Sequence, residues 1–189
     1  MNNLLDLIKN RRSIRKYMPD QIKDEELNLI LEAGIFAPSG HNDQPWYFTV
    51  IQNKEVLDEI NIKSKELMKK ASTDWIVKMA ENEKYHILHN APTVIIVSGL
   101  ETNNKELPYC PMADCSAAVQ NMLLMAESLG VASCWVGLTT FIFEDEEEVK
   151  KLNLPEGYKP QFAVTLGYSA ITKELKALPR KENVINYIK

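Results

Sequence analysis

The residues best suited to chemistry near the start of the chain are basic. Five cations and no acidic residue occur between Lys9 and Lys16. Arg11, Ser13 and Arg15 fall on one side of an extended strand, and the two arginines also share a helical face, because residues four apart superpose in both periods. Guanidinium groups bind phosphate bidentately, and Ser13 adds a hydroxyl donor. The segment therefore suits one small anion, although a solvated basic turn after a short helix explains the same residues.

A second polar segment runs from Pro38 to Trp46 and is dense in turn-forming residues and side-chain amides. A plain connector between a helix and a strand explains its proline and glycine. It does not explain Asn42 and Gln44 together, since an amide offers both a donor and an acceptor and suits the edge of a heterocycle. We expect this loop to present polar groups from a shaped backbone.

A third candidate lies at the end of an apolar run over residues 131–138, which reads as a strand leading into Gly137. Without a Cβ, Gly137 allows a flat ligand to approach the backbone closely. A strand bulge at the same glycine is the competing interpretation, and the sequence favours neither.

Composition and charge limit the classes of function that the chain can have. The chain has 189 residues, is 45% hydrophobic and 25% charged, and carries a net charge of -4. We expect a single domain over residues 1–189 that binds no nucleic acid. The longest uncharged run, Ser128 to Phe143, is too short to span a membrane, and the first nine residues contain Asp6 and no long apolar stretch. These features predict a soluble, cytoplasmic protein.

Metal binding is a weaker alternative. Three cysteines without CxxC spacing suit a reducing compartment. A structural zinc module could be built only from His86, His89, Cys110 and Cys115, and their spacing matches no established zinc pattern.

Helices dominate the first half of the predicted element order. A short amphipathic helix over residues 4–8 precedes the basic segment, and a second runs from Asp24 toward Pro38. Residues 54–88 read as two charged helices divided near residues 72–74, with a strand before them at 47–52.

Strands and one long helix follow. Residues 93–97 and 160–168 form strands, and an apolar helix over 114–129 lies between them with burial on several faces. A short acidic helix covers residues 144–152. The last apolar residues, 184–188, are strand-like and have to pack somewhere, a partner subunit being one candidate.

Four motifs follow one another along the chain: RRSIR at residues 11–15, PSGHNDQPW at 38–46, SLGVASCWVGL at 128–138 and LGY at 166–168. In this order they resemble the FMN-dependent nitroreductase family in its small single-domain form. The resemblance implies an α+β sandwich with a mainly antiparallel central sheet flanked by helices, assembled as an intertwined homodimer with composite active sites. It also implies these flavin-binding residues: Arg11, Arg12, Ser13, Arg15, Pro38, Ser39, Gly40, Asn42, Gln44, Trp135, Gly137, Leu138, Arg180 and Lys181.

The same resemblance implies the activity. NADH or NADPH passes a hydride to FMN, and the reduced flavin then reduces a nitroaromatic, quinone or similar small-molecule acceptor by a ping-pong mechanism, with no catalytic side chain assigned. A flavin-binding storage or sensor protein without turnover would carry the same motifs. Leu138 follows Gly137 where the family has Gly-Gly or Glu-Gly, and either Arg180 or Lys181 could meet the phosphate.

Overall fold

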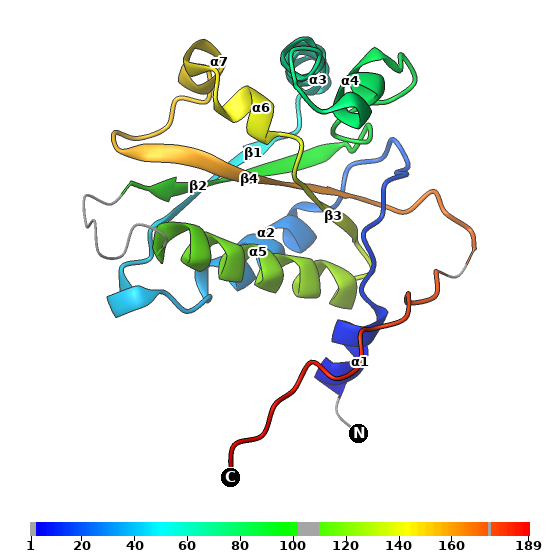
Figure 1. Ribbon diagram of the computed structural model, residues 1–189, viewed down its shortest axis with the longest axis vertical. Helices are drawn as coiled ribbons and strands as arrows, with labels where there is room; N and C mark the ends of the chain where they lie inside the picture. Colours follow the sequence, from blue (N-terminus) through cyan, green and yellow to red (C-terminus); the bar gives the residue numbers. More distant parts are fainter. Residues whose placement is uncertain (1–2, 102–109, 174) are drawn as a thin grey trace.

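A four-stranded antiparallel sheet is the centre of the molecule (Figure 1). The structure, a computed structural model, describes residues 3–101, 110–173 and 175–189. The strands lie in the order β1-β2-β4-β3. Their bounds are β1 Trp46–Ile51, β2 Thr93–Leu100, β3 Ala132–Val136 and β4 Tyr158–Gly167. Runs of β-branched residues favour these strands, and the predicted mainly antiparallel sheet with helices on its faces is confirmed.

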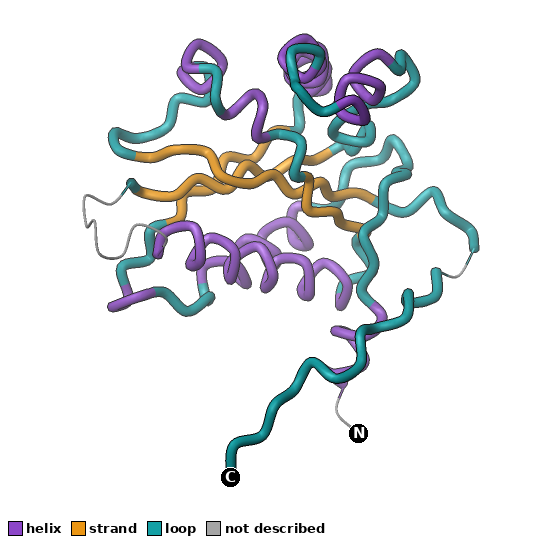
Figure 2. Tube along the Cα trace, in the orientation of Figure 1, coloured by secondary structure: helices purple, strands orange, loops and turns teal. Residues whose placement is uncertain are grey.

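One face of the sheet is covered by α2 (Asp24–Ile35) and α5 (Cys110–Ser128), as Figure 2 shows. The two helices approach so closely that a Cβ on Gly34 would lie 2.4 Å from Cε of Met122. Met122 is fully buried, so α5 forms the centre of this half of the core as its apolar pattern predicted. The helix begins at Cys110 rather than at Asp114, because small and apolar residues continue its pattern toward the N-terminus.

The other face carries α3 (Lys54–Met68), α4 (Asp74–Glu81), α6 (Thr140–Phe143) and α7 (Glu146–Lys150). The predicted break between two charged helices is confirmed, and Asn53 caps α3 by accepting a hydrogen bond from the backbone N–H of Val56 (3.1 Å). The predicted helix through Leu88 is wrong beyond Glu81. There Asn82 is extended (φ -70°, ψ 104°) and ends α4. The chain continues as a loop in which His89 and Asn90 have positive φ angles of 58° and 54°.

The two ends of the chain lie outside these layers (Figure 1). Helix α1 (Asn3–Asn10) exposes Leu4, Leu5 and Ile8, and the C-terminal segment runs past it. The prediction of a strand over residues 184–188 is wrong for the isolated chain. These residues form an extended coil and are exposed, because a β-strand requires the edge of a neighbouring strand and one chain provides none there.

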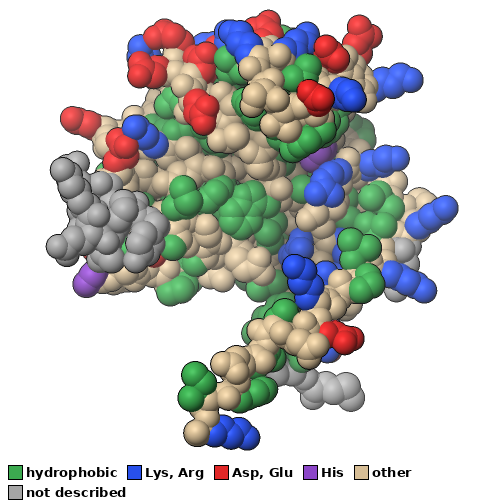
Figure 3. All heavy atoms as spheres, viewed as in Figure 1, with side chains coloured by type: hydrophobic (Ala, Val, Ile, Leu, Met, Phe, Trp, Pro, Cys, Tyr) green, Lys and Arg blue, Asp and Glu red, His purple; other side chains and the backbone are tan. Residues whose placement is uncertain are grey.

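Charge is distributed unevenly over the surface. Acidic and basic side chains alternate over α3, α4 and α7, whereas Lys and Arg side chains gather where the N-terminal and C-terminal segments pass each other (Figure 3). No helix within the described ranges is long and apolar enough to cross a membrane.

Candidate functional site

The N-terminal basic segment lies along β3, at the edge of the sheet. Ser13 forms a parallel bridge with Ser133, and the backbone N–H of Ile14 donates to the Ser133 carbonyl at 2.9 Å. The fold thus places the first predicted motif beside the third, although 120 residues separate Ser13 from Ser133 in the sequence (133 minus 13). Backbone pairing with an edge strand holds the segment extended, the conformation in which alternate residues share one side.

Three of the predicted anion-binding side chains converge at this edge. Burial raises the pKa of the Cys134 thiol, and Arg15, Ser13 and Arg11 oppose that rise. All three therefore lie around the same buried sulfur atom. Ser13 and Arg11 are half-buried and Arg15 is exposed, so the group is open to a ligand. Two guanidinium groups and a hydroxyl suit a phosphate.

Arg12 is used differently by the chain. Its Nε donates to the carbonyl of Leu175 at 3.0 Å, and one terminal nitrogen donates to the carbonyls of Lys9 (2.6 Å) and Arg11 (2.9 Å). The guanidinium group thereby joins the end of α1, the basic segment and the start of the C-terminal segment. These contacts suit a side chain that stabilises the fold better than one that binds a ligand.

Strand β3 ends at Val136, and Gly137 begins a turn. The Thr140 N–H donates to the Gly137 carbonyl at 3.2 Å, and the Thr139 hydroxyl donates to the Val136 carbonyl at 3.0 Å. Gly137 is exposed, and a Cβ built on it meets nothing within 4 Å. The backbone is accessible from that side, as the close-approach interpretation requires. The bulge interpretation is wrong, since the register irregularity lies between Val97 and Ser98 of β2.

The side chains around Gly137 point to different faces of the sheet. Trp135 packs edge-on against Phe162, with ring centroids 4.7 Å apart, on the face covered by α5. Val136 and Leu138 pack in the cluster on the opposite face. The indole therefore belongs mainly to the core, and of the three predicted residues in this stretch Gly137 offers the most open backbone.

The loop with the second motif lies at the far end of α5. The Gly40 N–H donates to both carboxylate oxygens of Asp114 (3.3 Å each), and Ser39 Oγ accepts from the Gln44 N–H at 3.0 Å. His41, Asn42 and Gln44 have positive φ angles of 52°, 61° and 47°. The loop is shaped by hydrogen bonds within it and to α5, and it exposes the side chains of Asn42 and Gln44, as predicted. Pro38 is exposed at its start.

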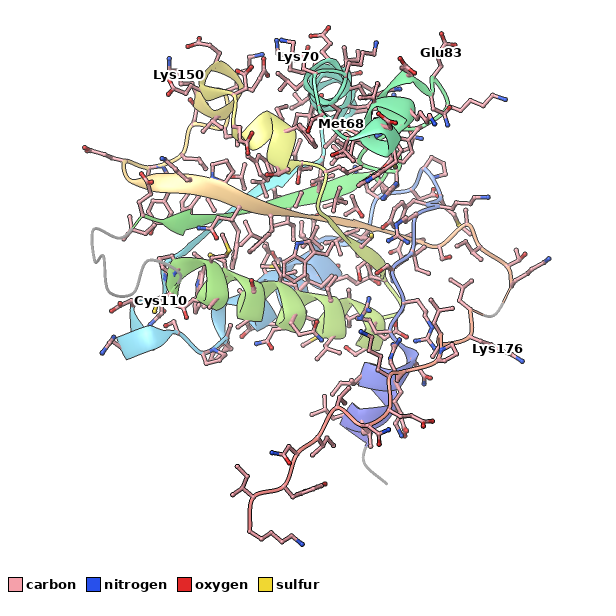
Figure 4. The ribbon with its side chains drawn as sticks, in the orientation of Figure 1. Met68, Lys70, Glu83, Cys110, Lys150 and Lys176 are labelled. Carbon is pink, nitrogen blue, oxygen red and sulfur yellow. The ribbon has the colours of Figure 1, made fainter. Side chains whose placement is uncertain are left out.

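A single chain therefore does not bring the first two motifs together. Asp114 contacts the Gly40 loop, whereas Glu127, near the other end of α5, lines a pocket with Arg12 and Ile14. Thirteen residues of α-helix rise about 20 Å. Figure 4 shows the separation: the label Cys110 marks the loop end of α5, and the label Lys176 lies on the opposite side of the molecule.

The predicted tail cations are exposed in the C-terminal segment. Arg180 donates through a terminal nitrogen to the Leu178 carbonyl at 3.4 Å. Lys181 is exposed beside it. Their role at a phosphate stays a prediction.

The structure places beside the basic segment two residues that the sequence analysis did not link to it. Tyr85 and His89 lie in the loop between α4 and β2, with ring centroids 6.0 Å apart in an edge-to-face pair. Burial raises the pKa of Tyr85 and lowers the pKa of His89 to about 4, and the charge of Arg15 acts on both groups. They therefore flank the basic segment from the face opposite α5. No spacing in the sequence links them to Arg15.

The zinc alternative finds no support in the structure. Over residues 3–101, 110–173 and 175–189, no three His, Cys, Asp or Glu side chains are grouped to hold a metal ion. His86 Nε2 instead lies 3.4 Å from Asp58 Oδ1.

Two nitroreductases are among the solved structures that match over the whole chain. A nitroreductase from Bacteroides fragilis, solved with bound FMN, is 35% identical in sequence with a TM-score of 0.88, covering 100% of both chains. A nitroreductase from Desulfitobacterium hafniense, also solved with bound FMN, is 30% identical with a TM-score of 0.87 and the same coverage.

Comparison of sequences agrees with the fold. A protein of Archaeoglobus fulgidus, provisionally named an NADH dehydrogenase/NAD(P)H nitroreductase, is 34% identical over an alignment 180 residues long that covers 92% of this chain and 90% of that protein. The family model described as "Nitroreductase family" matches residues 8–168. That range includes the basic segment, the Pro38–Trp46 loop and the end of β3, and the chain belongs to the nitroreductase family.

Proposed function

We propose that the protein is an FMN-dependent oxidoreductase that takes a hydride from NADH or NADPH and reduces a small acceptor such as a nitroaromatic or a quinone. The observation that carries the proposal is the convergence of Arg11, Ser13 and Arg15 beside β3 and the accessible backbone of Gly137. Relatives solved with bound FMN support it.

The chemistry of these residues fits FMN. Arg11 and Arg15 supply two forked cations and Ser13 supplies a hydroxyl donor, and together these groups suit a terminal phosphate. Gly137 leaves room for a flat ring against the backbone. We assign Arg12 to holding the segment in place, because its donors already engage three carbonyl groups.

Two copies of the chain are required to complete this site. Asn42 and Gln44 lie at the other end of α5 from Arg11, so within our proposal the amides that meet the ring come from a partner subunit. Exposed apolar side chains support a homodimer. Leu4, Leu5 and Ile8 on α1 are 58%, 44% and 46% exposed, and Ile188 in the C-terminal segment is 93% exposed. Burial of such residues favours association.

Bound FMN would supply the hydride chemistry, accepting from the nicotinamide and reducing the second substrate. The chain's own residues bind and orient. Arg11, Ser13 and Arg15 hold the phosphate end, and the Gly137 backbone borders the ring. If donor and acceptor use one pocket in turn, initial rates at several acceptor concentrations give parallel double-reciprocal lines. Intersecting lines would instead indicate a ternary complex.

The decisive experiment is an absorbance spectrum of the purified protein before and after addition of NADH or NADPH under anaerobic conditions. We expect a yellow protein whose flavin absorbance bleaches with at least one donor and returns with the acceptor. Bound flavin that neither donor bleaches would indicate storage or sensing without turnover. A colourless protein that retains no flavin after incubation with FMN and removal of the unbound FMN would contradict both functions.

A further inference from the structure

Tyr17 directly follows the basic segment, and its hydroxyl contacts the backbone in the middle of that segment. The Tyr17 hydroxyl donates to the Ile14 carbonyl at 2.6 Å and lies 2.8 Å from the Thr165 hydroxyl on β4. The Thr165 hydroxyl in turn lies 3.2 Å from the Cys134 carbonyl on β3. These contacts connect the segment, β4 and β3 through two side-chain hydroxyls.

The protons of this connection can be counted. Tyr17 has one hydroxyl proton, which the short contact assigns to the Ile14 carbonyl. Thr165 has one, which serves either Tyr17 Oη or the Cys134 carbonyl. Burial raises the pKa of Tyr17, so the phenol stays protonated and remains a donor. Thr165 is fully buried, and loss of the phenol would leave its hydroxyl with one partner fewer.

The ring of Tyr17 is also held in place by packing. A Cβ on Gly167 would lie 2.9 Å from Tyr17 Cδ1 and 2.8 Å from Pro92 Cδ, so the ring rests directly on the Gly167 backbone. Tyr17 also forms an antiparallel bridge with Ser169, and the Met18 N–H donates to the Tyr168 carbonyl at 2.8 Å.

These contacts leave residues 13–17 little freedom. One end is fixed by the bond from Ile14 to Ser133 and the other by the bridge at Ser169, while the Tyr17 hydroxyl ties the two ends together. Ser13 and Arg15 flank the tied carbonyl of Ile14 in the chain. Their side chains reach the surroundings of Cys134 from this fixed backbone.

We propose that Tyr17 is a positioning residue for the phosphate end of the flavin cofactor, acting with Thr165 through the Ile14 carbonyl to hold Ser13 and Arg15 in place. The inference rests on the proposed function and adds residues that need not touch the cofactor. Because it concerns the phosphate end alone, it predicts a difference between FMN and riboflavin, which share the ring and ribityl chain and differ only in the phosphate.

The test measures the dissociation constants of FMN and riboflavin for the apoprotein by flavin fluorescence. For Tyr17→Phe we expect FMN binding to weaken by about tenfold and riboflavin binding to change by less than about twofold. Tyr47→Phe is the matched control, since it removes the same atom from the exposed tyrosine of β1 at the other edge of the sheet.

A second pair of variants covers the case in which Tyr17→Phe does not fold. Thr165→Val removes the hydroxyl at nearly constant volume, and Thr165→Ser keeps it. We expect Thr165→Val to weaken FMN binding selectively and Thr165→Ser to retain most of it. Far-ultraviolet circular dichroism and thermal melting of each apoprotein verify the fold.

The outcomes separate the inference from the proposed function. Equal weakening of both flavins in Tyr17→Phe, unchanged FMN binding, or equal losses in Thr165→Ser and Thr165→Val would overturn the positioning role while wild-type FMN binding stands. A wild-type protein that binds neither flavin would overturn the proposed function and the positioning role with it.

Discussion

At the scale of single residues, the basic segment contains cations with three different surroundings. Arg11 and Arg15 lie around Cys134, Arg12 binds backbone carbonyls, and Lys16 is exposed. Charge alone does not distinguish them. From these contacts we propose that Arg11 and Arg15 bind an anion and that Arg12 stabilises the fold, and substitutions can test this difference.

Arg11→Ala is expected to weaken FMN binding by about tenfold or more, because a charge-assisted contact to a phosphate contributes roughly 1.5–3 kcal/mol. Titration of the apoprotein with FMN measures the change. Lys16→Ala is the control, since it removes a neighbouring positive charge from an exposed side chain. Equal losses in the two variants would show that net charge, rather than the position of Arg11, attracts the cofactor.

Gly137→Val tests where the ring lies. A Cβ at this position meets nothing within 4 Å in the chain, so the apoprotein should melt at the wild-type temperature. A branched side chain would nevertheless occupy the space of a flat ligand, and FMN binding should weaken by about tenfold or more, with Gly137→Ala intermediate. Full FMN affinity in the valine variant would place the flavin against another strand.

At the scale of elements, α5 both builds the core and keeps the two polar motifs apart. Its buried residues contact α2 and the sheet, while its two ends meet the Gly40 loop and the Arg12 pocket. The loop between α4 and β2 brings Tyr85 and His89 to Arg15 on the opposite face. Residues from both faces of the sheet therefore lie next to the candidate site.

We predict that the stability of the protein depends on pH through His89, in the loop between α4 and β2. Burial lowers the pKa of His89 from 6.5 to about 4, with Arg15 and His86 acting in the same direction. The unfolded chain therefore binds a proton at His89 at higher pH than the folded chain does. The contribution of neutral His89 to stability is therefore fully present above about pH 6.5 and is lost as the pH falls toward about 4.

Urea unfolding at about pH 7.5 and about pH 5 measures this effect as a shift of the midpoint. We expect His89→Gln to show a smaller decrease than the wild type on acidification. His41→Gln, at an exposed histidine of η1 (Gly40–Asn42), should keep the full decrease. Identical shifts in the wild type and His89→Gln would assign the acid sensitivity to other groups.

At the scale of the whole molecule, one chain has a core but leaves its two ends uncovered. Val184, Ile185 and Tyr187 are 70%, 69% and 75% exposed, and α1 adds Leu4 and Ile8. In water such side chains favour association, and a second copy of the chain is the occupant that our proposed composite site requires.

Deletion of residues 183–189 should therefore remove dimerisation and flavin binding together. The truncation keeps Arg180 and Lys181, so loss of the cofactor could not be attributed to loss of those cations. Light scattering measures the mass, and the ratio of flavin to protein absorbance measures occupancy. A truncated monomer with full occupancy would contradict the composite site.

The sequence by itself determined the local features. The pattern of its apolar residues indicated α2, α5 and the four strands, and the polar residues at 72–74 indicated the division between α3 and α4. The turn-rich loop around Asn42 was recognisable because Pro, Gly and amide residues have distinct local preferences. The order and spacing of the motifs also indicated the family, because the residues that bind a cofactor occur in short, recognisable segments.

Tertiary structure decided what depends on contacts between distant residues. That Arg12 binds the Leu175 carbonyl, that Trp135 packs on Phe162, and that Tyr17 reaches Thr165 follow from the pairing of strands and segments far apart in the sequence. The predicted tail strand failed for the same reason. Whether an extended segment forms a strand depends on an edge to pair with, and hydrophobic periodicity does not encode where that edge lies.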